Sequence, residues 1–258
     1  MTVLRLQNLQ IPDCEDIVEQ GFYEWGRGYP ADALEPPWQE ASLDRKRIIV
    51  SRGYALYEGL PVQRGNDIGL MEIYFSVGVN SYVILYDAVR FLTLADAARP
   101  LLARIPDGVA LEESTDEQID AAAQLIDLFS TASHIDRGKA IKVLYKKRPE
   151  FIPVIDSIVS HFLWKNFPHL LTQQSSNRDV LRLFRHILMA QIRPLSQVKS
   201  SLKEKGLSLS TGRLLSYLIW LVWRKRDAEA IRTLWGTDIL KEAKMKAQQM
   251  WEQQRSEE

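Results

Sequence analysis

The spacing of apolar residues changes at about residue 65, and this change constrains the fold more than any other feature of the chain. From Asp67 onward, apolar residues recur at intervals of three and four, the period of a helix that buries one face. Segments with the alternating polarity of strands are almost absent after that point. The sequence therefore predicts a mainly α-helical, two-lobed globule of roughly eight to ten helices. Its 258 residues suffice for one sizeable core, or for two lobes that share a cleft.

The expected organisation has three parts. Residues 1–65 are rich in glycine, proline and aromatic residues and are expected to form an irregular N-terminal region, with a short strand pair at 48–50 and 54–57. Residues 66–240 form the helical domain, and residues 241–258 form a charged C-terminal helix.

Capping residues and prolines mark the expected helix ends. Asp67 is expected to cap the first helix, and Pro100 and Pro106 are expected to stop helices in the segment that follows. Ser114 and Thr115 precede acids and a helical apolar pattern, which is the chemistry of a helix start.

Composition and motifs argue against several classes of function. Lys and Arg total 33, as do Asp and Glu, so a basic surface has to be local. The single cysteine excludes a disulfide framework and multi-cysteine metal sites. The histidines lack metal-binding spacing, and neither a phosphate-binding glycine loop nor a nucleophile elbow is present. We therefore expect no metal and no nucleotide cofactor.

The location of the protein is expected to be cytoplasmic, without a membrane partner. The N-terminus lacks the basic-then-apolar pattern of a signal peptide. The longest apolar run, Leu214–Trp223, is far shorter than the ~20 residues that span a bilayer.

The segment AIKVLYKKRPEFIPVIDSIV, residues 140–159, carries the chemistry that remains. On a helix from about Arg137 to Lys147, the lysines at 139, 142 and 146 share one face, while Ala140, Val143 and Leu144 face the core. The basic face is either solvated or contacts phosphates.

Asp156 follows this basic helix and opens the next one. Pro149 ends the basic helix and Pro153 stiffens the link, so Asp156 lies at a helix start. It is either a helix cap, or a reactive carboxylate beside a basic patch.

This order of elements resembles the helix-hairpin-helix superfamily of DNA glycosylases, over residues 133–166. The segment is more similar to one in an uncharacterised bacterial domain family, ASKLLARKRPRLIPVYDSVV, which is itself glycosylase-like. The matching positions are Ala140, Lys142, Leu144, Lys147, Arg148, Pro149, Ile152, Pro153, Val154, Asp156, Ser157 and Val159. The similarity to that bacterial family extends loosely over residues 65–225.

The resemblance implies a DNA partner and a catalytic role for Asp156. In the superfamily a hairpin binds a DNA phosphate through backbone amides, and the aspartate lies beside the flipped nucleotide. The residues expected to contact DNA are Arg137, Lys139, Lys142, Lys146, Lys147 and Arg148, with Arg213 as a further candidate. The candidate walls of a base pocket are Trp25, Tyr29, Trp38, Tyr54, Tyr57 and Tyr74. An elaborated pocket would suit a modified base, such as one in phage DNA.

The sequence departs from the superfamily pattern upstream of Asp156. Residues 134–136 read His-Ile-Asp where the hairpin has Gly-hydrophobic-Gly, so Asp136 is an alternative helix cap. Gly138 stands where strand-cutting members have a lysine nucleophile, which implies a monofunctional enzyme.

The prediction is therefore a monofunctional DNA base-excision glycosylase with Asp156 as its carboxylate, in the setting of DNA repair or antiviral defence. Two alternatives stay open. One is a non-catalytic, glycosylase-like DNA-binding module, and the other is a helical interaction domain in which Asp156 is only a cap.

Overall fold

The computed structural model describes residues 4–6, 9–11, 65–76, 83–132, 135–204 and 208–226. This part of the chain is mainly α-helical, as predicted. Its nine α-helices are α3 (Leu70–Phe75), α4 (Leu85–Thr93), α5 (Ala95–Ala103), α6 (Asp116–Ser130), α7 (Arg137–Lys147), α8 (Ser157–Asn166), α9 (Asn177–Ala190), α10 (Ile192–Glu204) and α11 (Thr211–Arg226). A 3₁₀ turn, η4 (Leu111–Glu113), precedes α6.

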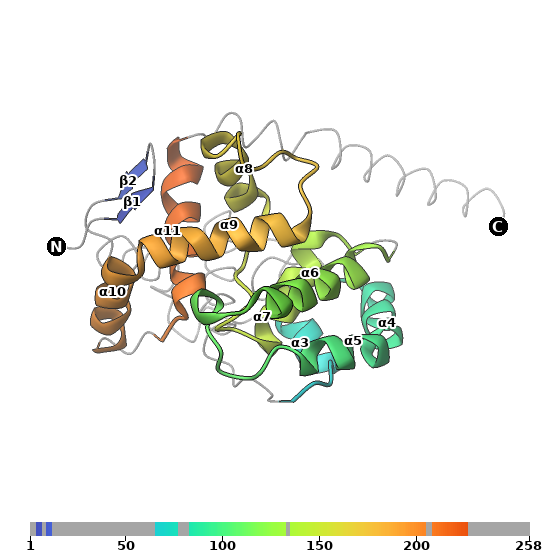
Figure 1. Ribbon diagram of the computed structural model, residues 1–258. Coiled ribbons are helices and arrows are strands. Elements are labelled where there is room, and N and C mark those ends of the chain that lie inside the picture. The colour runs from blue at the N-terminus through green and yellow to red at the C-terminus, as the bar shows by residue number, and fades with distance from the viewer. Residues whose placement is uncertain are drawn as a thin grey trace, which may run out of the picture.

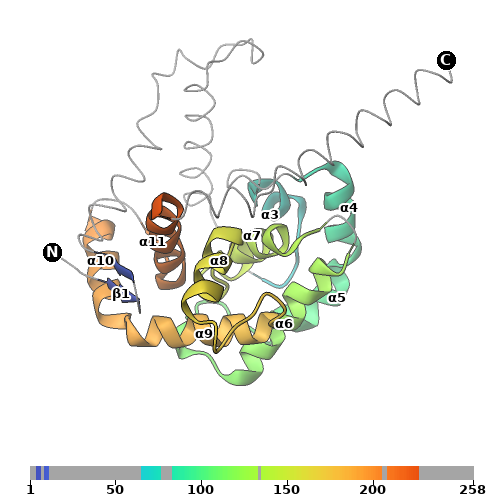
Figure 2. The ribbon, with the colours of Figure 1, turned by 90° about the horizontal axis from the view of Figure 1, so that it is seen from above.

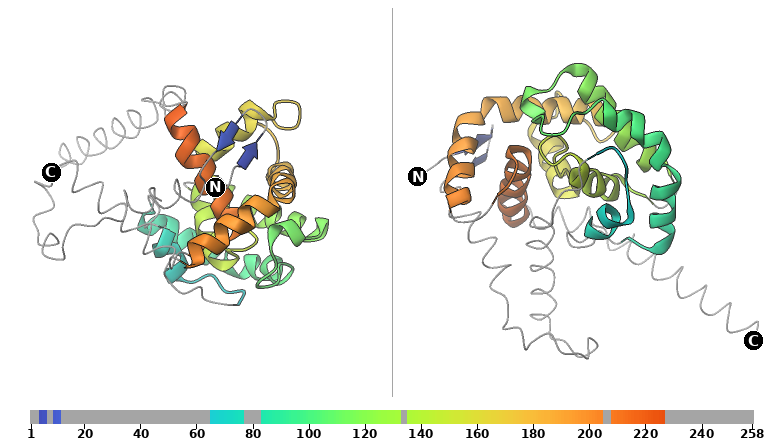
Figure 3. Two further views of the ribbon diagram at one scale, coloured as in Figure 1. Left: turned by 90° about the vertical axis from the view of Figure 1, so that its left-hand side faces the viewer. Right: turned by 90° about the horizontal axis from the view of Figure 1, so that it is seen from below.

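The helices form an outer arc and an inner set. Figure 2 shows α10, α9, α6, α5 and α4 following one another around the outside, with α11, α8, α7 and α3 inside the arc. The view from below shows the same arrangement (Figure 3). Along the chain the helices form two groups, α3–α7 and α8–α11, which the extensive packing of α9 on α6 and on η4 joins. The buried apolar residues of both groups nevertheless form one large hydrophobic cluster.

The chain links the two groups through residues 148–156, between α7 and α8. Phe151 and Ile152 in this link are almost fully buried, so they anchor it in the core. On the far side of α8, α11 packs along it and also contacts α10 (Figure 1). The start of α8 therefore lies where α7, the link and α11 come together.

Two helix starts follow the capping chemistry that the sequence predicts. Thr115 accepts a hydrogen bond from the backbone N–H of Gln118, whose side chain accepts one from the N–H of Thr115, at 3.3 and 2.9 Å. Asp136 accepts one from the N–H of Lys139 at 2.8 Å and so caps α7. The capping role considered for Asp136 is confirmed.

Two other expectations about helix ends are wrong. Asp67 does not cap α3, because the helix begins after Gly69, whose N–H donates to Glu72 at 2.9 Å, and Asp67 instead pairs with Arg99 at 2.7 Å. Pro100 does not stop a helix, since α5 runs through it. Proline lacks a backbone donor and crowds the carbonyl four residues earlier, so its effect falls on the preceding turn, and α5 continues to Ala103.

One pair of short strands, β1 (Leu4–Leu6) and β2 (Leu9–Ile11), was not predicted from the sequence. The strands are antiparallel, with Arg5 opposite Gln10. The strand pair expected at residues 48–57 and the helix expected at 241–258 lie outside the described residues.

Candidate active site

Asp156 lies at the N-terminus of α8 and caps it, as predicted. Its Oδ1 accepts hydrogen bonds from the backbone N–H groups of Ile158 and Val159, both at 3.0 Å. Val154 and Ile155 before it are buried, so the link holds the carboxylate in one place. The other oxygen, Oδ2, accepts no hydrogen bond from any described residue. Capping thus uses Oδ1, and Oδ2 is available to a bound substrate or water.

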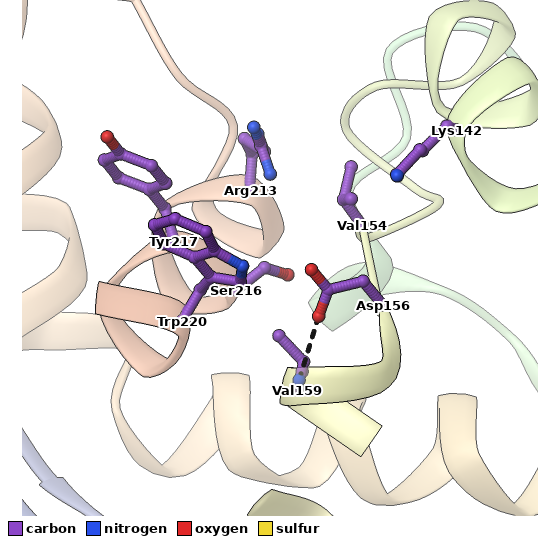
Figure 4. A pocket seen from close by; sticks show the side chains of 8 residues that line it. All are labelled: Lys142, Val154, Asp156, Val159, Arg213, Ser216, Tyr217 and Trp220. Carbon is purple, nitrogen blue, oxygen red and sulfur yellow. Dashed lines mark hydrogen bonds between the residues drawn. The ribbon is translucent and has the colours of Figure 1, made fainter. Parts of the chain in front are cut away.

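A pocket opens beside the carboxylate, between α7, the link, α8 and α11. It has free space for about one water molecule. Figure 4 shows the carboxylate of Asp156 directed into it, with side chains of α11 opposite. The lining residues are Lys142, Val154, Asp156, Val159, Arg213, Ser216, Tyr217 and Trp220. The pocket therefore combines one carboxylate, two cations and two aromatic rings.

The position of Asp156 raises the pKa of its carboxyl group. The residue is partly exposed, but the protein surrounds the carboxylate, and this burial disfavours the charged form. Three influences oppose burial with smaller effects: the amide of Val159 together with that of Ile158, the charge of Lys142 and the charge of Arg213. The pKa of Lys142 is lowered, chiefly by burial. Raised and lowered pKa values in one pocket are typical of functional sites.

The far wall of the pocket comes from one face of α11. Residues 213, 216, 217 and 220 occupy positions i, i+3, i+4 and i+7 of α11, so their side chains lie on one face of the helix. Arg213 is 5% exposed. Its guanidinium carbon lies 5.8 Å from the ring centre of Tyr145 and 5.6 Å from that of Tyr217. The rings of Tyr217 and Trp220 are stacked, with 5° between their planes. Arg213 thus lies near the rings of Tyr145 and Tyr217, and Trp220 stacks on Tyr217.

Lys147 and Arg148 do not form the DNA-contacting surface that the sequence suggested. Lys147 is 1% exposed and its Nζ lies 3.0 Å from Oε1 of Glu72, which is 2% exposed. Arg148 is buried and donates to the carbonyl of Leu102 at 3.0 Å, and it pairs with Asp107 at 2.9 Å. Phosphate contact requires access to solvent, so both residues stabilise the fold instead.

The lysines at 139, 142 and 146 do not share one solvated face. Lys139 pairs with the fully buried Asp87 of α4 at 2.8 Å, Lys142 lines the pocket, and Lys146 is 3% exposed. Arg137 is partly buried near Asp127, and no described residue accepts a hydrogen bond from its Nε. Of the six predicted DNA contacts, only Lys142 lies beside Asp156 in the pocket.

The aromatic walls come from residues that the sequence analysis did not select. Tyr74, the one described member of the predicted set, is 51% exposed on α3 and does not line the pocket. Trp25, Tyr29, Trp38, Tyr54 and Tyr57 lie outside the described residues, as do Ser133 and His134. The sequence did not point to Tyr217 and Trp220 because they lie in the long apolar run Leu214–Trp223 and have the pattern of core residues. The signal was Arg213, a cation immediately before that apolar run and one turn before Tyr217.

Neither a metal site nor a membrane-spanning helix is seen in the described ranges. No three His, Cys, Asp or Glu side chains gather there as a metal site requires. Among the described helices, none combines the length and hydropathy of a membrane-spanning segment.

These features define a mainly α-helical protein with a partly desolvated carboxylate in a cationic, aromatic pocket. The chain belongs to the family described as a family of unknown function (DUF6308), whose model matches residues 80–221. All the residues that line the pocket lie within that range. Neither the curated proteins nor the solved structures include a match.

Proposed function

We propose that the protein is a monofunctional DNA glycosylase in which Asp156 promotes hydrolysis of the bond between a base and its sugar. One observation carries this proposal: the carboxylate is fixed by two backbone amides through Oδ1, while Oδ2 faces a pocket that holds two cations and two aromatic rings. The resemblance of residues 133–166 to the glycosylase superfamily supports the choice of DNA as substrate.

The chemistry needs a carboxylate placed in this way. As the glycosidic bond breaks, positive charge develops on the sugar, and a fixed anion stabilises that charge. Oδ2 of Asp156 is the oxygen available for this role. The space beside it suits the attacking water, which the same oxygen orients and deprotonates. Protein around the carboxylate strengthens its attraction to the cationic sugar.

The wall formed by α11 provides a surface for the extruded base. Stacking on aromatic rings is how proteins hold bases taken out of a duplex, and the partly exposed ring of Trp220, which stacks on Tyr217, supplies such a surface. Because the pocket has space for about one water molecule, the partly exposed Trp220 has to move when a nucleotide enters.

The proposal is tested with oligonucleotides that carry ordinary and modified bases, single- and double-stranded. We expect the protein to release one class of free base, detected by mass spectrometry, and to leave an abasic site that breaks in alkali. Strand breaks should not appear without alkali, because the proposed reaction is monofunctional. Binding without release of any base from any of these DNAs would exclude the enzyme and favour a binding module.

The acid side of the pH profile provides a second test, with Lys142→Met as the variant. The carboxylate has to be charged, so kcat/KM should fall as pH drops through the raised pKa of Asp156. The charge of Lys142 lowers that pKa. Removing it should therefore move the fall in kcat/KM to higher pH, with activity at alkaline pH changed much less. An unchanged midpoint would contradict this coupling, and Lys203→Met, an exposed lysine on α10, is the control.

A further inference from the structure

An exposed apolar surface covers α3 and α4, and none of its residues lines the pocket. The described residues include ten large hydrophobic side chains that are markedly exposed, and all but Leu170 and Met189 belong to this surface. Its members are Leu70, Met71, Tyr74, Ile84, Leu85, Tyr86, Val89 and Leu92, which we call the α3–α4 surface. The two helices pack on each other, so the exposed residues of both belong to neighbouring elements.

The pattern along α4 is that of a helix with two partners. Asp87, Ala88 and Phe91 are buried against the protein. On the opposite side, Leu85 and Val89 are 74% and 52% exposed. Leu92 continues this line, so the spacing is four and then three, which is the seam of a helix that packs against another helix.

The size of the α3–α4 surface fits a stable interface. From the exposed fractions, its side chains present about 800 Å² to solvent, which is what each partner of a standard-size interface buries. The largest apolar patch on a typical monomer is roughly 300–600 Å². An apolar surface of this extent is therefore larger than a monomer normally leaves in water.

We propose that the α3–α4 surface is a homodimer interface, in which α4 pairs antiparallel with α4 of a second copy about a two-fold axis near Val89. Such an arrangement is self-complementary, because it places Leu92 of each copy near Tyr86 of the other. The assignment goes beyond the proposed function, and neither depends on the other.

The charges on α4 favour a second copy over a different protein. Unlike partners are selected largely through complementary charges. The α4 helix has two charged residues, Asp87 and Arg90, and Asp87 is fully buried. The guanidinium of Arg90 is engaged by Tyr86, to whose hydroxyl it donates at 2.7 and 3.1 Å. The exposed face of α4 thus carries one cation, Arg90, and is otherwise apolar, so it offers little charge for an unlike partner to match.

Light scattering across a range of protein concentrations tests the dimer. We expect a dimer for the wild-type chain, and a dissociation constant at least ~30-fold weaker for Leu85→Glu combined with Val89→Glu. The matched control is Met189→Glu on α9, since Met189 and Val89 are both 52% exposed. Circular dichroism shows whether each variant is folded. A wild-type monomer at every concentration, or a dimer that survives the double substitution, would overturn the proposal.

Cross-linking tests the placement of the axis. Cys14 is the only native cysteine, so Cys14→Ser provides a background for Val89→Cys. Near a two-fold axis the two copies of residue 89 are adjacent, and mild oxidation should give a covalent dimer. Met189→Cys in the same background should give far less. Equal cross-linking of the two variants would show random collision and would overturn the proposed pairing.

Discussion

Asp156→Asn is expected to lower base excision by about 10²–10⁴-fold while leaving the protein folded. The amide side chain keeps the shape of the carboxylate, but it carries no charge to stabilise the sugar cation and cannot accept the proton of the attacking water. Its oxygen still accepts hydrogen bonds from Ile158 and Val159, because asparagine caps helices about as well as aspartate. The measurement is kcat/KM on the DNA that the wild-type protein cleaves.

The stability of this variant separates loss of the carboxylate charge from loss of the helix cap. A carboxyl group whose pKa is raised in the folded state stabilises the fold below its unfolded pKa, and this contribution is lost as pH rises through the folded pKa. Near neutral pH the wild type therefore bears the cost of a buried charge that the variant lacks. We expect Asp156→Asn to be at least as stable there, by urea denaturation, and less stable relative to the wild type only in acid.

Asp136→Asn is the matched control for Asp156→Asn. Asp136 also caps a helix, with a hydrogen bond of 2.8 Å from Lys139, but it is exposed and does not line the pocket. The substitution should leave excision nearly unchanged and alter the free energy of unfolding by less than about 1 kcal/mol. Loss of activity in both variants would point to helix ends rather than to the carboxylate, and full activity in Asp156→Asn would remove Asp156 from the mechanism.

The position of Asp156 at a helix start could be predicted from the sequence because it depends on local chemistry. Pro149 and Pro153 restrict the link between two helical patterns, and an aspartate before an apolar run starts a helix, so α7, α8 and the cap could be predicted within a few residues. Asp136 was open to two interpretations, and the observed cap selects one of them. Each of these features depends on neighbours within about four residues, which sequence patterns report directly.

Long-range partners explain what the sequence did not predict. The lysine spacing on α7 is the same for a solvated face and for a buried one, and partners far away in sequence decide between them, such as Asp87 for Lys139 and Glu72 for the neighbouring Lys147. The pocket wall on α11 could not be predicted from the sequence for a similar reason. Tyr217 and Trp220 are typical core residues by pattern, and their role appears only when α11 is seen across from Asp156.

Lys147→Ala is expected to reduce the free energy of unfolding by about 3–5 kcal/mol, because it leaves Glu72 as a buried charge without its partner. Urea denaturation measures this loss, and Lys203→Ala on the exposed face of α10 should change stability by less than about 0.5 kcal/mol. If Lys147 instead contacted DNA, the variant would keep its stability and show a weaker salt dependence of binding.

The double variant Lys147→Met, Glu72→Gln then separates loss of the pair from loss of packing. Glutamine keeps an oxygen that accepts the N–H of Gly69, and methionine fills most of the space of the lysine chain, so no charge is left buried. Its stability should exceed that of Lys147→Met alone, with a coupling of about 1–3 kcal/mol between the two sites. Additive losses would mean that the charges do not compensate each other. The pair would then no longer explain why a lysine within the basic run of α7 lies in the core.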